Sequence, residues 1–363
     1  MLNFNDIFVD DTKYGMKIPK EKYLSVGLYP VIDQSKEQIA GYTDESEGIY
    51  CDVPAIIFGD HTRIIKYIDV PFFLGADGTK LLKIKDNTAF NCKYLYYALS
   101  NAKIPNTGYN RHFKWLKELS FNIPSIEKQR EIADLMDIIV NLENLRKKQL
   151  EKLELFVKSR FIEMFIQNDA VFPKKKLGEC TIINPKKSMD NRLKDDLIVS
   201  FVPMAAVGED GSINTSDTKT YCEVKNGFTY FIDGDVLFAK ITPCMENGKG
   251  AVATNLSNGI GFGSTEFHVI RPLEGITNPV WLYTLSVLKE FRLAAEANMT
   301  GSAGQKRTPS SFLQNYEIKL PPIDLQDQFA DFVAQVDKSK LAIQQSLDEL
   351  ETLKKSLMQQ YFG

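Results

Sequence analysis

The sequence predicts two mixed α/β domains, each followed by one long helix, with the two helices paired as an antiparallel coiled coil. One observation is an internal repeat, in which the second half of the chain resembles the first. Another is that each copy of the repeat ends in a long amphipathic stripe without internal proline or glycine until Gly363. The length of 363 residues agrees with this organisation, because domains of roughly 100–200 residues would number two or three.

The repeat is clearest where the two stripes lie. Residues 121–165 align with residues 318–362 at one constant offset and without a gap. Further upstream, residues 95–100 resemble residues 281–286, and residues 108–111 resemble residues 304–307. The identical pairs near the stripes include Pro124/Pro321, Ile126/Ile323, Gln129/Gln326, Ala133/Ala330, Asp134/Asp331, Leu150/Leu347, Leu153/Leu350, Glu154/Glu351, Lys158/Lys355, Ser159/Ser356 and Phe165/Phe362.

The first domain is expected over residues 1–120 and the second over residues 174–317. Both regions alternate short β-branched or aromatic runs with turn signals such as Asp77-Gly78 and Asn247-Gly248. Three of these runs are predicted strands, at residues 55–58, 199–202 and 235–238. Residues 167–176 are expected to be a linker that joins the first long helix to the second domain.

The long helices are expected over residues 121–167 and 318–363. A proline near the start of each range, Pro124 or Pro321, marks where the helix itself begins, because the missing N–H of proline is tolerated there. The apolar stripe of the second helix is interrupted by Lys340 and Lys354, and consists of Val336, Ile343, Leu347, Leu350, Leu357 and Tyr361. That of the first helix is interrupted by Glu143, Arg146 and Arg160, and consists of Ile139, Leu150, Leu153, Val157 and Met164. The similar registers favour pairing of the two helices. The alternative is that each helix packs only on its own domain.

Composition argues against several classes of protein. The N-terminus lacks the basic and apolar segments of a signal peptide, and no apolar run is long enough to span a membrane. The five scattered cysteines predict reduced thiols and a cytoplasmic location. The net charge of −3 arises in the C-terminal segment. If the chain binds DNA, a partner is therefore expected to supply much of the contact with the phosphates.

No complete catalytic motif is present. Gly248-Lys-Gly250 lacks the spacing of a phosphate-binding loop, and Gly261-Phe-Gly263 has no strand–helix context that would make it a nucleotide site. The three histidines are far apart in sequence and are expected to be core or surface residues. We therefore expect neither an enzyme active site nor a metal or cofactor on this chain.

Several motifs together resemble one family. The helix entrance LPPIDLQ (residues 320–326) and the tail LETLKKSLM (350–358) resemble the specificity subunit of Type I restriction–modification systems. So do FVPMAAV (201–207), GDVLFAKITPCMENGKG (234–250) and GIGFGSTEF (259–267). The segments GLYPV (27–31), IAGY (39–42) and PAIIFGDHTR (54–63) resemble a diverged first copy. The first domain begins almost at residue 1, with little of the N-terminal extension that is usual in this family.

The resemblance implies two target-recognition domains that each recognise one half of a bipartite, asymmetric double-stranded DNA site. It also implies two methyltransferase subunits docked on the helices, and two restriction subunits that join them. S-adenosylmethionine, ATP and Mg²⁺ would then be bound by those partners, which methylate adenine and cleave DNA. Two alternatives remain open: the recognition subunit of a fused restriction–methylation enzyme, and a scaffold whose domains bind something other than DNA.

Candidate DNA-contacting residues are polar side chains in turn-rich loops, which can reach base edges or phosphates. In the first domain they are Asp60, His61, Thr62, Arg63, Lys80, Tyr109, Asn110, Arg111 and His112. In the second domain they are Lys240, Thr242, Glu246, Asn247, Lys249, Ser264, Thr265, Gln305, Lys306 and Arg307.

Overall fold

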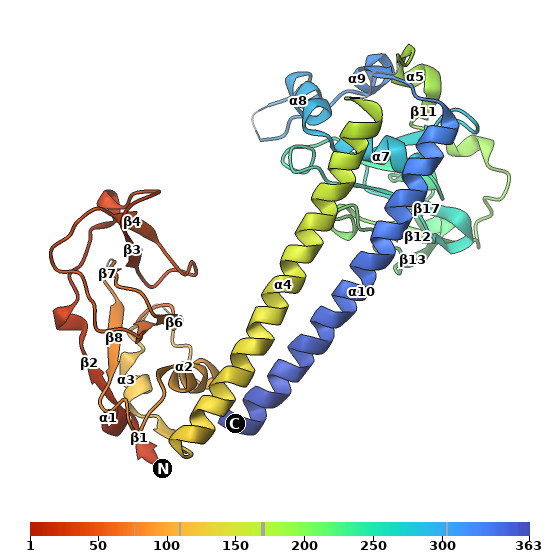
Figure 1. Cartoon of the computed structure of the whole chain (residues 1–363). Coiled ribbons are helices and arrows are strands. Elements are labelled where there is room, and N and C mark those ends of the chain that lie inside the picture. Colours follow the sequence, from red (N-terminus) through yellow and green to blue (C-terminus); the bar gives the residue numbers. More distant parts are fainter. Residues whose placement is uncertain (76, 109, 168–170, 303) are drawn as a thin grey trace. The chain divides into compact units, whose positions relative to one another are not determined.

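The computed structural model describes residues 1–75, 77–108, 110–167, 171–302 and 304–363 (Figure 1). The chain divides into two compact units. Unit 1 comprises Met1–Lys148 together with Gln344–Gly363, and unit 2 comprises Gln149–Ile343. Each unit therefore contains one globular domain and parts of both long helices, α4 (Ile126–Phe165) and α10 (Ile323–Phe362).

The domain of unit 1 contains two main sheets. A four-stranded antiparallel sheet has the order β2-β8-β5-β6, and a three-stranded sheet has the order β4-β3-β7 with β3 and β7 parallel. The strands are β1 (Leu2–Asn3), β2 (Phe8–Asp10), β3 (Tyr29–Ile32), β4 (Gly41–Thr43), β5 (Ala55–Gly59), β6 (Ile65–Ile68), β7 (Phe73–Leu74), β8 (Thr79–Ile84) and β9 (Ser120–Phe121). The helices are α1 (Phe4–Ile7), η1 (Thr12–Tyr14), η2 (Lys20–Lys22), α2 (Cys92–Asn101) and α3 (Phe113–Lys117).

The domain of unit 2 repeats this plan with additions. Its sheets have the orders β11-β18-β15-β16 and β13-β12-β17-β14, and β12 and β17 are parallel. The strands are β10 (Lys174–Lys176), β11 (Thr181–Ile183), β12 (Ile198–Val202), β13 (Thr218–Thr220), β14 (Thr229–Ile232), β15 (Val236–Ala239), β16 (Gly250–Val252), β17 (Ile260–Gly263), β18 (Phe267–Pro272) and β19 (Glu317–Lys319). The helices are α5 (Leu177–Cys180), η3 (Lys187–Met189), η4 (Met204–Ala206), α6 (Tyr221–Val224), η5 (Ser257–Gly259), α7 (Pro279–Val287), α8 (Lys289–Ala297) and α9 (Ser310–Asn315).

The predicted duplication is confirmed in the sheets. The central strands β5 and β15 each pair with β8 or β18 on one side and with β6 or β16 on the other. The predicted strands at residues 55–58, 199–202 and 235–238 correspond to β5, β12 and β15, and all side chains of β5 and β15 are buried. A continuous apolar run is expected for a strand that is covered on both faces.

The predicted helix pairing is confirmed within each unit. Every position of the two stripes is buried or partly buried, including the charged interruptions. In unit 1 the last turns of α10 pack on the domain core beside Ile132 and Met136 of α4. In unit 2 Phe329 of α10 contacts Phe161 and Phe165 of α4, with ring centroids 5.3 and 5.6 Å apart. The early part of one helix thus lies against the late part of the other in both units, which is the antiparallel arrangement.

The predicted linker is partly wrong. Residues 168–170 lie outside the described residues, but Lys174–Lys176 form β10, which pairs with β19. All three lysines are exposed, as expected for a linker, but they belong to a two-stranded sheet. Lysine is compatible with such an edge, because its charge prevents pairing with other chains.

The predicted match between residues 95–100 and 281–286 is displaced by one residue. Asn91 caps α2 by accepting the N–H of Tyr94, and Asn278 caps α7 by accepting the N–H of Trp281. These caps pair Tyr94 with Trp281, and both aromatic side chains are fully buried. Identical Leu and Ser residues had suggested the alignment of residue 95 with residue 281. Leu and Ser are common in helices, so their identity does not fix the alignment, whereas the capping residue fixes which side chains of the helix are buried.

Within the described residues, none of the helices combines the length and the apolar character needed to cross a membrane. All five cysteines are free thiols, and those of Cys51 and Cys222 are exposed.

Candidate nucleic-acid interface

Three loops of unit 2 converge at the ends of β15 and β18. The N–H of Lys240, directly after β15, donates to the carbonyl of Glu266 at 2.9 Å. The carbonyl of Lys240 accepts from the N–H of Thr308 at 2.8 Å. The structure therefore brings together the candidate segments around residues 240–249, 264–266 and 305–307, which are far apart in sequence.

Unit 1 contains the same arrangement. The N–H of Asp60, directly after β5, donates to the carbonyl of Gly78 at 2.7 Å, and its carbonyl accepts from the N–H of His112 at 2.8 Å. Asp60 thus occupies the place of Lys240, and His112 that of Thr308. The duplication extends from the sheets to the loops that hold the candidate residues.

The candidates of unit 2 form a mostly accessible set. Glu246, Asn247, Thr265, Gln305 and Lys306 are exposed, and the other five (Lys240, Thr242, Lys249, Ser264 and Arg307) are partly exposed. Two of them are also held in place. The amide of Asn247 donates to Glu209 at 2.9 Å, and the ammonium of Lys249 donates to the carbonyl of Met204 at 3.2 Å.

Arg307 is paired within the protein. Its guanidinium contacts both carboxylate oxygens of Glu266, at 2.8 and 2.9 Å. This hydrogen bond holds the pKa of Glu266 below its usual value, against the opposing effect of partial burial. The pairing leaves the side chain of Arg307 43% exposed, so a base or a phosphate would have to share or replace Glu266 as its partner.

Two candidates of unit 1 need correction. Asp60 and His112 are 3% and 0% exposed. The carboxylate of Asp60 accepts the N–H of Phe113 at 2.7 Å, and Nδ1 of His112 lies 2.9 Å from the carbonyl of Asp60. Both side chains hold the two loops together, and neither can reach a DNA groove. The polarity of these two side chains suggested that they lie at the surface. The sequence did not show their buried hydrogen bonds, because the partner of each lies about fifty residues away.

The other candidates of unit 1 lie nearer the surface. Thr62, Asn110 and Arg111 are exposed, and His61, Arg63 and Lys80 are partly exposed. The ammonium of Lys80 lies 3.1 Å from Asp10 and 4.9 Å from the ring centroid of Phe113. Tyr109 lies outside the described residues.

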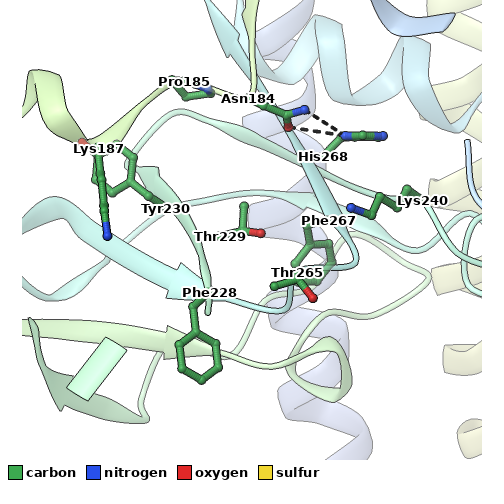
Figure 2. Close-up of a pocket in the computed structure, with 10 residues that line it drawn as sticks. All are labelled: Asn184, Pro185, Lys187, Phe228, Thr229, Tyr230, Lys240, Thr265, Phe267 and His268. Carbon is green, nitrogen blue, oxygen red and sulfur yellow. Dashed lines mark hydrogen bonds between the residues drawn. The ribbon is translucent and has the colours of Figure 1, made fainter. Parts of the chain in front are cut away.

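A depression of about 290 Å³ adjoins the loops of unit 2 (Figure 2). Lys187 and Lys240 lie at its two ends in this view, with Thr229 and Thr265 between them. Its lining residues are Asn184, Pro185, Lys187, Phe228, Thr229, Tyr230, Lys240, Thr265, Phe267 and His268. Two ammonium groups with hydroxyls and an aromatic ring suit a phosphate or a base edge.

Asn184 and His268 form one wall of this depression, and the sequence analysis missed both. Nε2 of His268 lies 2.8 Å from the carbonyl of Thr308 and must donate to it, so Nδ1 accepts from the amide of Asn184 at 3.0 Å. Burial lowers the pKa of His268, which favours the neutral form of the ring. Asn184 has a φ of 53°, which asparagine tolerates better than most residues. The dipeptide Asn184-Pro185 is a turn signal in the sequence. The sequence does not show that Asn184 pairs with His268, which lies 84 residues further along the chain.

In the described parts of the chain, no three His, Cys, Asp or Glu side chains lie close enough together to bind a metal ion. The arrangement offers hydrogen-bond donors, acceptors and positive charge on loops held by a rigid sheet. Such a surface is suited to recognition.

Comparisons with known proteins agree with this description. The chain is 38% identical over 182 residues to the Type I restriction enzyme EcoAI specificity subunit of Escherichia coli. Over 148 residues it is 42% identical to the EcoEI specificity subunit of the same organism. These alignments cover 48% and 40% of this chain, and 30% and 24% of the two relatives. The matched region is thus less than a third of the length of either relative.

Two solved structures are similar over nearly the whole chain. The S subunit of a Type I restriction–modification system from M. genitalium aligns with 99% of this chain and 95% of its own, with a TM-score of 0.59 and 14% identity. A chain from a structure concerned with complex assembly and conformational transition of the type I R-M system aligns with 99% and 96%, with a TM-score of 0.57 and 16% identity. Because the sequence identities are only 14% and 16%, these two similarities show that the folds are alike and show nothing further.

The family model described as Type I restriction modification DNA specificity domain matches residues 3–155 and again residues 164–352. These two matches take in most of the sequence and reproduce the repeat that the structure shows in its sheets, loops and helices. The chain therefore belongs to the family of Type I restriction modification DNA specificity domains and contains two copies of that domain.

Proposed function

We propose that this chain is the DNA-recognition subunit of a Type I restriction–modification complex, with each unit recognising one half of a bipartite, asymmetric DNA site. The observation that carries the proposal is the duplicated meeting of three loops after β5 and after β15. Because each unit has one such surface, each unit can recognise one half-site. Because the loops of the two units differ, the two half-sites should differ in sequence, which makes the whole site asymmetric.

The residues that we propose to contact DNA are the accessible members of the two loop sets. They are the exposed or partly exposed candidates: His61, Thr62, Arg63, Lys80, Asn110 and Arg111 in unit 1, and Lys240, Thr242, Glu246, Asn247, Lys249, Ser264, Thr265, Gln305, Lys306 and Arg307 in unit 2. Asn and Gln can pair with adenine, Arg and Lys with guanine, and Glu with cytosine. Lys240, at the edge of the depression, can also neutralise a phosphate.

We further propose that the chain itself performs no reaction and works in the cytoplasm. Two methyltransferase subunits would bind the helices and provide S-adenosylmethionine and adenine methylation. Two restriction subunits would provide ATP- and Mg²⁺-dependent cleavage. The net charge of −3 supports a need for partners, because tight DNA binding by this chain alone would call for a basic excess.

The test of recognition is a domain exchange. Residues 174–317 are replaced by the same region of a relative with a different DNA site, and the complex with its methyltransferase is mapped for methylated sequences. One half-site should change while the other stays the same. A simultaneous change in both half-sites, or methylation without any sequence preference, would contradict independent recognition by the two units.

Subunit composition is tested separately. Light scattering of the chain purified with its methyltransferase should give a mass of two methyltransferase subunits per chain, as the duplication suggests. A uniform complex with one methyltransferase would refute this part of the proposal without affecting the domain exchange.

A further inference from the structure

The loop that joins β15 to β16 is longer than its counterpart in unit 1. It comprises residues 240–249, whereas residues 60–64 join β5 to β6. The longer loop is a compact turn, in which the N–H of Met245 donates to Ile241, that of Asn247 to Pro243 and that of Gly248 to Met245, all at 2.9–3.0 Å. The exposed candidates Glu246 and Asn247 lie within this turn.

Unit 2 also contains an additional helix. Residues 288–309 separate α7 from α9 and include α8, while residues 102–112 separate α2 from α3. Among the described residues of that shorter segment, none is helical. The two units therefore differ both in this turn and in this helix.

Arg292 of α8 connects the two additions. Its guanidinium donates to the carbonyl of Met245 at 3.0 Å and to that of Gly248 at 3.2 Å. It also lies 4.4 Å from the ring centroid of Phe238 in β15. The side chain is only 7% exposed, and the hydrogen bonds that the structure gives it all go to carbonyl groups. Burial lowers its pKa to about 10, so it remains charged at neutral pH.

A buried arginine directed at two carbonyls of one turn fixes the shape of that turn. Hydrogen bonds from a charged donor are stronger than those between neutral groups, and the planar guanidinium can bind two acceptors at once. A lysine in the same place would bring a single compact ammonium group. The residues between the two carbonyls, Glu246 and Asn247, are thereby held in one conformation.

We propose that Arg292 is a positioning residue for DNA specificity: by clamping the turn at Met245 and Gly248, it sets which base pairs unit 2 accepts. The inference rests on the proposed function, because it assumes that the turn contacts DNA. Arg292 itself is buried and touches no DNA. It acts through the exposed side chains of the turn.

The experiment compares Arg292→Met and Arg292→Lys with the unchanged chain, each in complex with the methyltransferase. A pool of duplexes that varies both half-sites is methylated in one tube and sequenced. The ratio of cognate to single-base variants is then independent of the fraction of active complex. Arg292→Met should lower this ratio at the second half-site by about tenfold or more, Arg292→Lys should have an intermediate effect, and the first half-site should be unchanged.

Val224→Ala is the matched control, because Val224 is a fully buried residue of unit 2 in a different part of the core. It should reduce thermal stability while leaving the ratio at both half-sites intact. If the Arg292 variants also leave the ratio intact, or lower it equally at both half-sites, Arg292 is only a stabilising residue and the inference is wrong. If the unchanged chain shows no preference at all, the proposed function itself fails.

Discussion

The side-chain oxygen of Gln326 in α10 accepts a hydrogen bond from the backbone nitrogen of Asn278, the residue that caps α7, at 2.9 Å. The amide nitrogen of Gln326 donates to the carbonyls of Ile276 and Pro321, at 3.0 and 2.9 Å. Gln129 makes the same set of contacts in unit 1, with Asn91, Ala89 and Pro124, at 2.9–3.0 Å. One buried glutamine thus joins a long helix to the cap of a domain helix in each unit.

Replacing this glutamine should destabilise the unit that contains it. Gln326→Ala leaves a backbone N–H without its acceptor and two carbonyls without a donor, and a buried unpaired polar group costs about 1–3 kcal/mol. Urea unfolding should show a loss of that order. The control is Gln335→Ala, at an exposed position of the same helix within unit 2. A loss of equal size in both variants would mean that the buried hydrogen bonds contribute nothing specific.

The charged interruptions of the two stripes include one pair. Lys354 lies 2.7 Å from Glu143, whose side chain is 8% exposed. Lys354→Leu should therefore cost roughly 1–3 kcal/mol, because it leaves a carboxylate buried without its cation, although the partial exposure of Lys354 limits the loss. The double variant Glu143→Leu/Lys354→Leu should recover most of it, as a pair of apolar side chains suits this position. Denaturation of the two single variants and the double variant measures the coupling, and strictly additive losses would contradict a direct interaction.

His268 should make unit 2 sensitive to mild acid. Its pKa is lowered by burial from an ordinary value of 6.5, so at pH below 6.5 the unfolded chain binds the proton more readily than the folded unit. Stability is therefore complete above pH 6.5 and should decline as the pH falls towards the lowered pKa. His268→Gln should flatten the unfolding free energy of unit 2 between pH 7 and 5. An unchanged slope in that variant would exclude the histidine as the cause.

The long helices should set the distance between the half-sites. Seven strong helix formers inserted after Lys148 in α4, and seven after Ile343 in α10, keep both stripes in register and lengthen each helix by roughly 10 Å. Base pairs stack about 3.4 Å apart, so the spacer should grow by up to about three base pairs while both half-sites stay the same. Methylation mapping gives the spacer. Insertion in α4 alone is the control and should reduce stability, because the two stripes no longer match; full activity with the original spacer would refute the prediction for the paired insertion.

The helices were predictable because their pairing depends on a periodic pattern in the sequence. Leu347 and Val336 lie on the predicted stripe and are buried, and Glu143 and Lys354 were recognisable as interruptions of it. That these two interruptions contact each other was not predictable, because the contact depends on the relative register of two segments about 200 residues apart.

The positions of the candidate DNA-contacting loops were predictable from the sequence, but the roles of their side chains were only partly so. Turn signals and polar residues located the loops, and the structure brings them together. The same polarity misled at Asp60 and His112, whose side chains satisfy buried backbone groups of another loop. Arg292 escaped notice for the opposite reason. It lies in an ordinary amphipathic helix, and only the fold places its guanidinium under the turn.

The division of each long helix between the two units affects the order in which the protein can mature during synthesis. Four partly buried side chains of α10 pack against the core of unit 1: Leu357, Met358, Tyr361 and Phe362. The ring of Phe362 lies 5.1 Å from that of Tyr94. A nascent chain that still lacks these turns of α10 has synthesised the whole first domain without this part of its apolar cover. Although domains generally fold N-terminal first as they emerge, here unit 1 is completed only after α10 has been made. A stop codon before Leu357 would therefore leave the apolar side chains of the first domain that α10 contacts exposed to solvent.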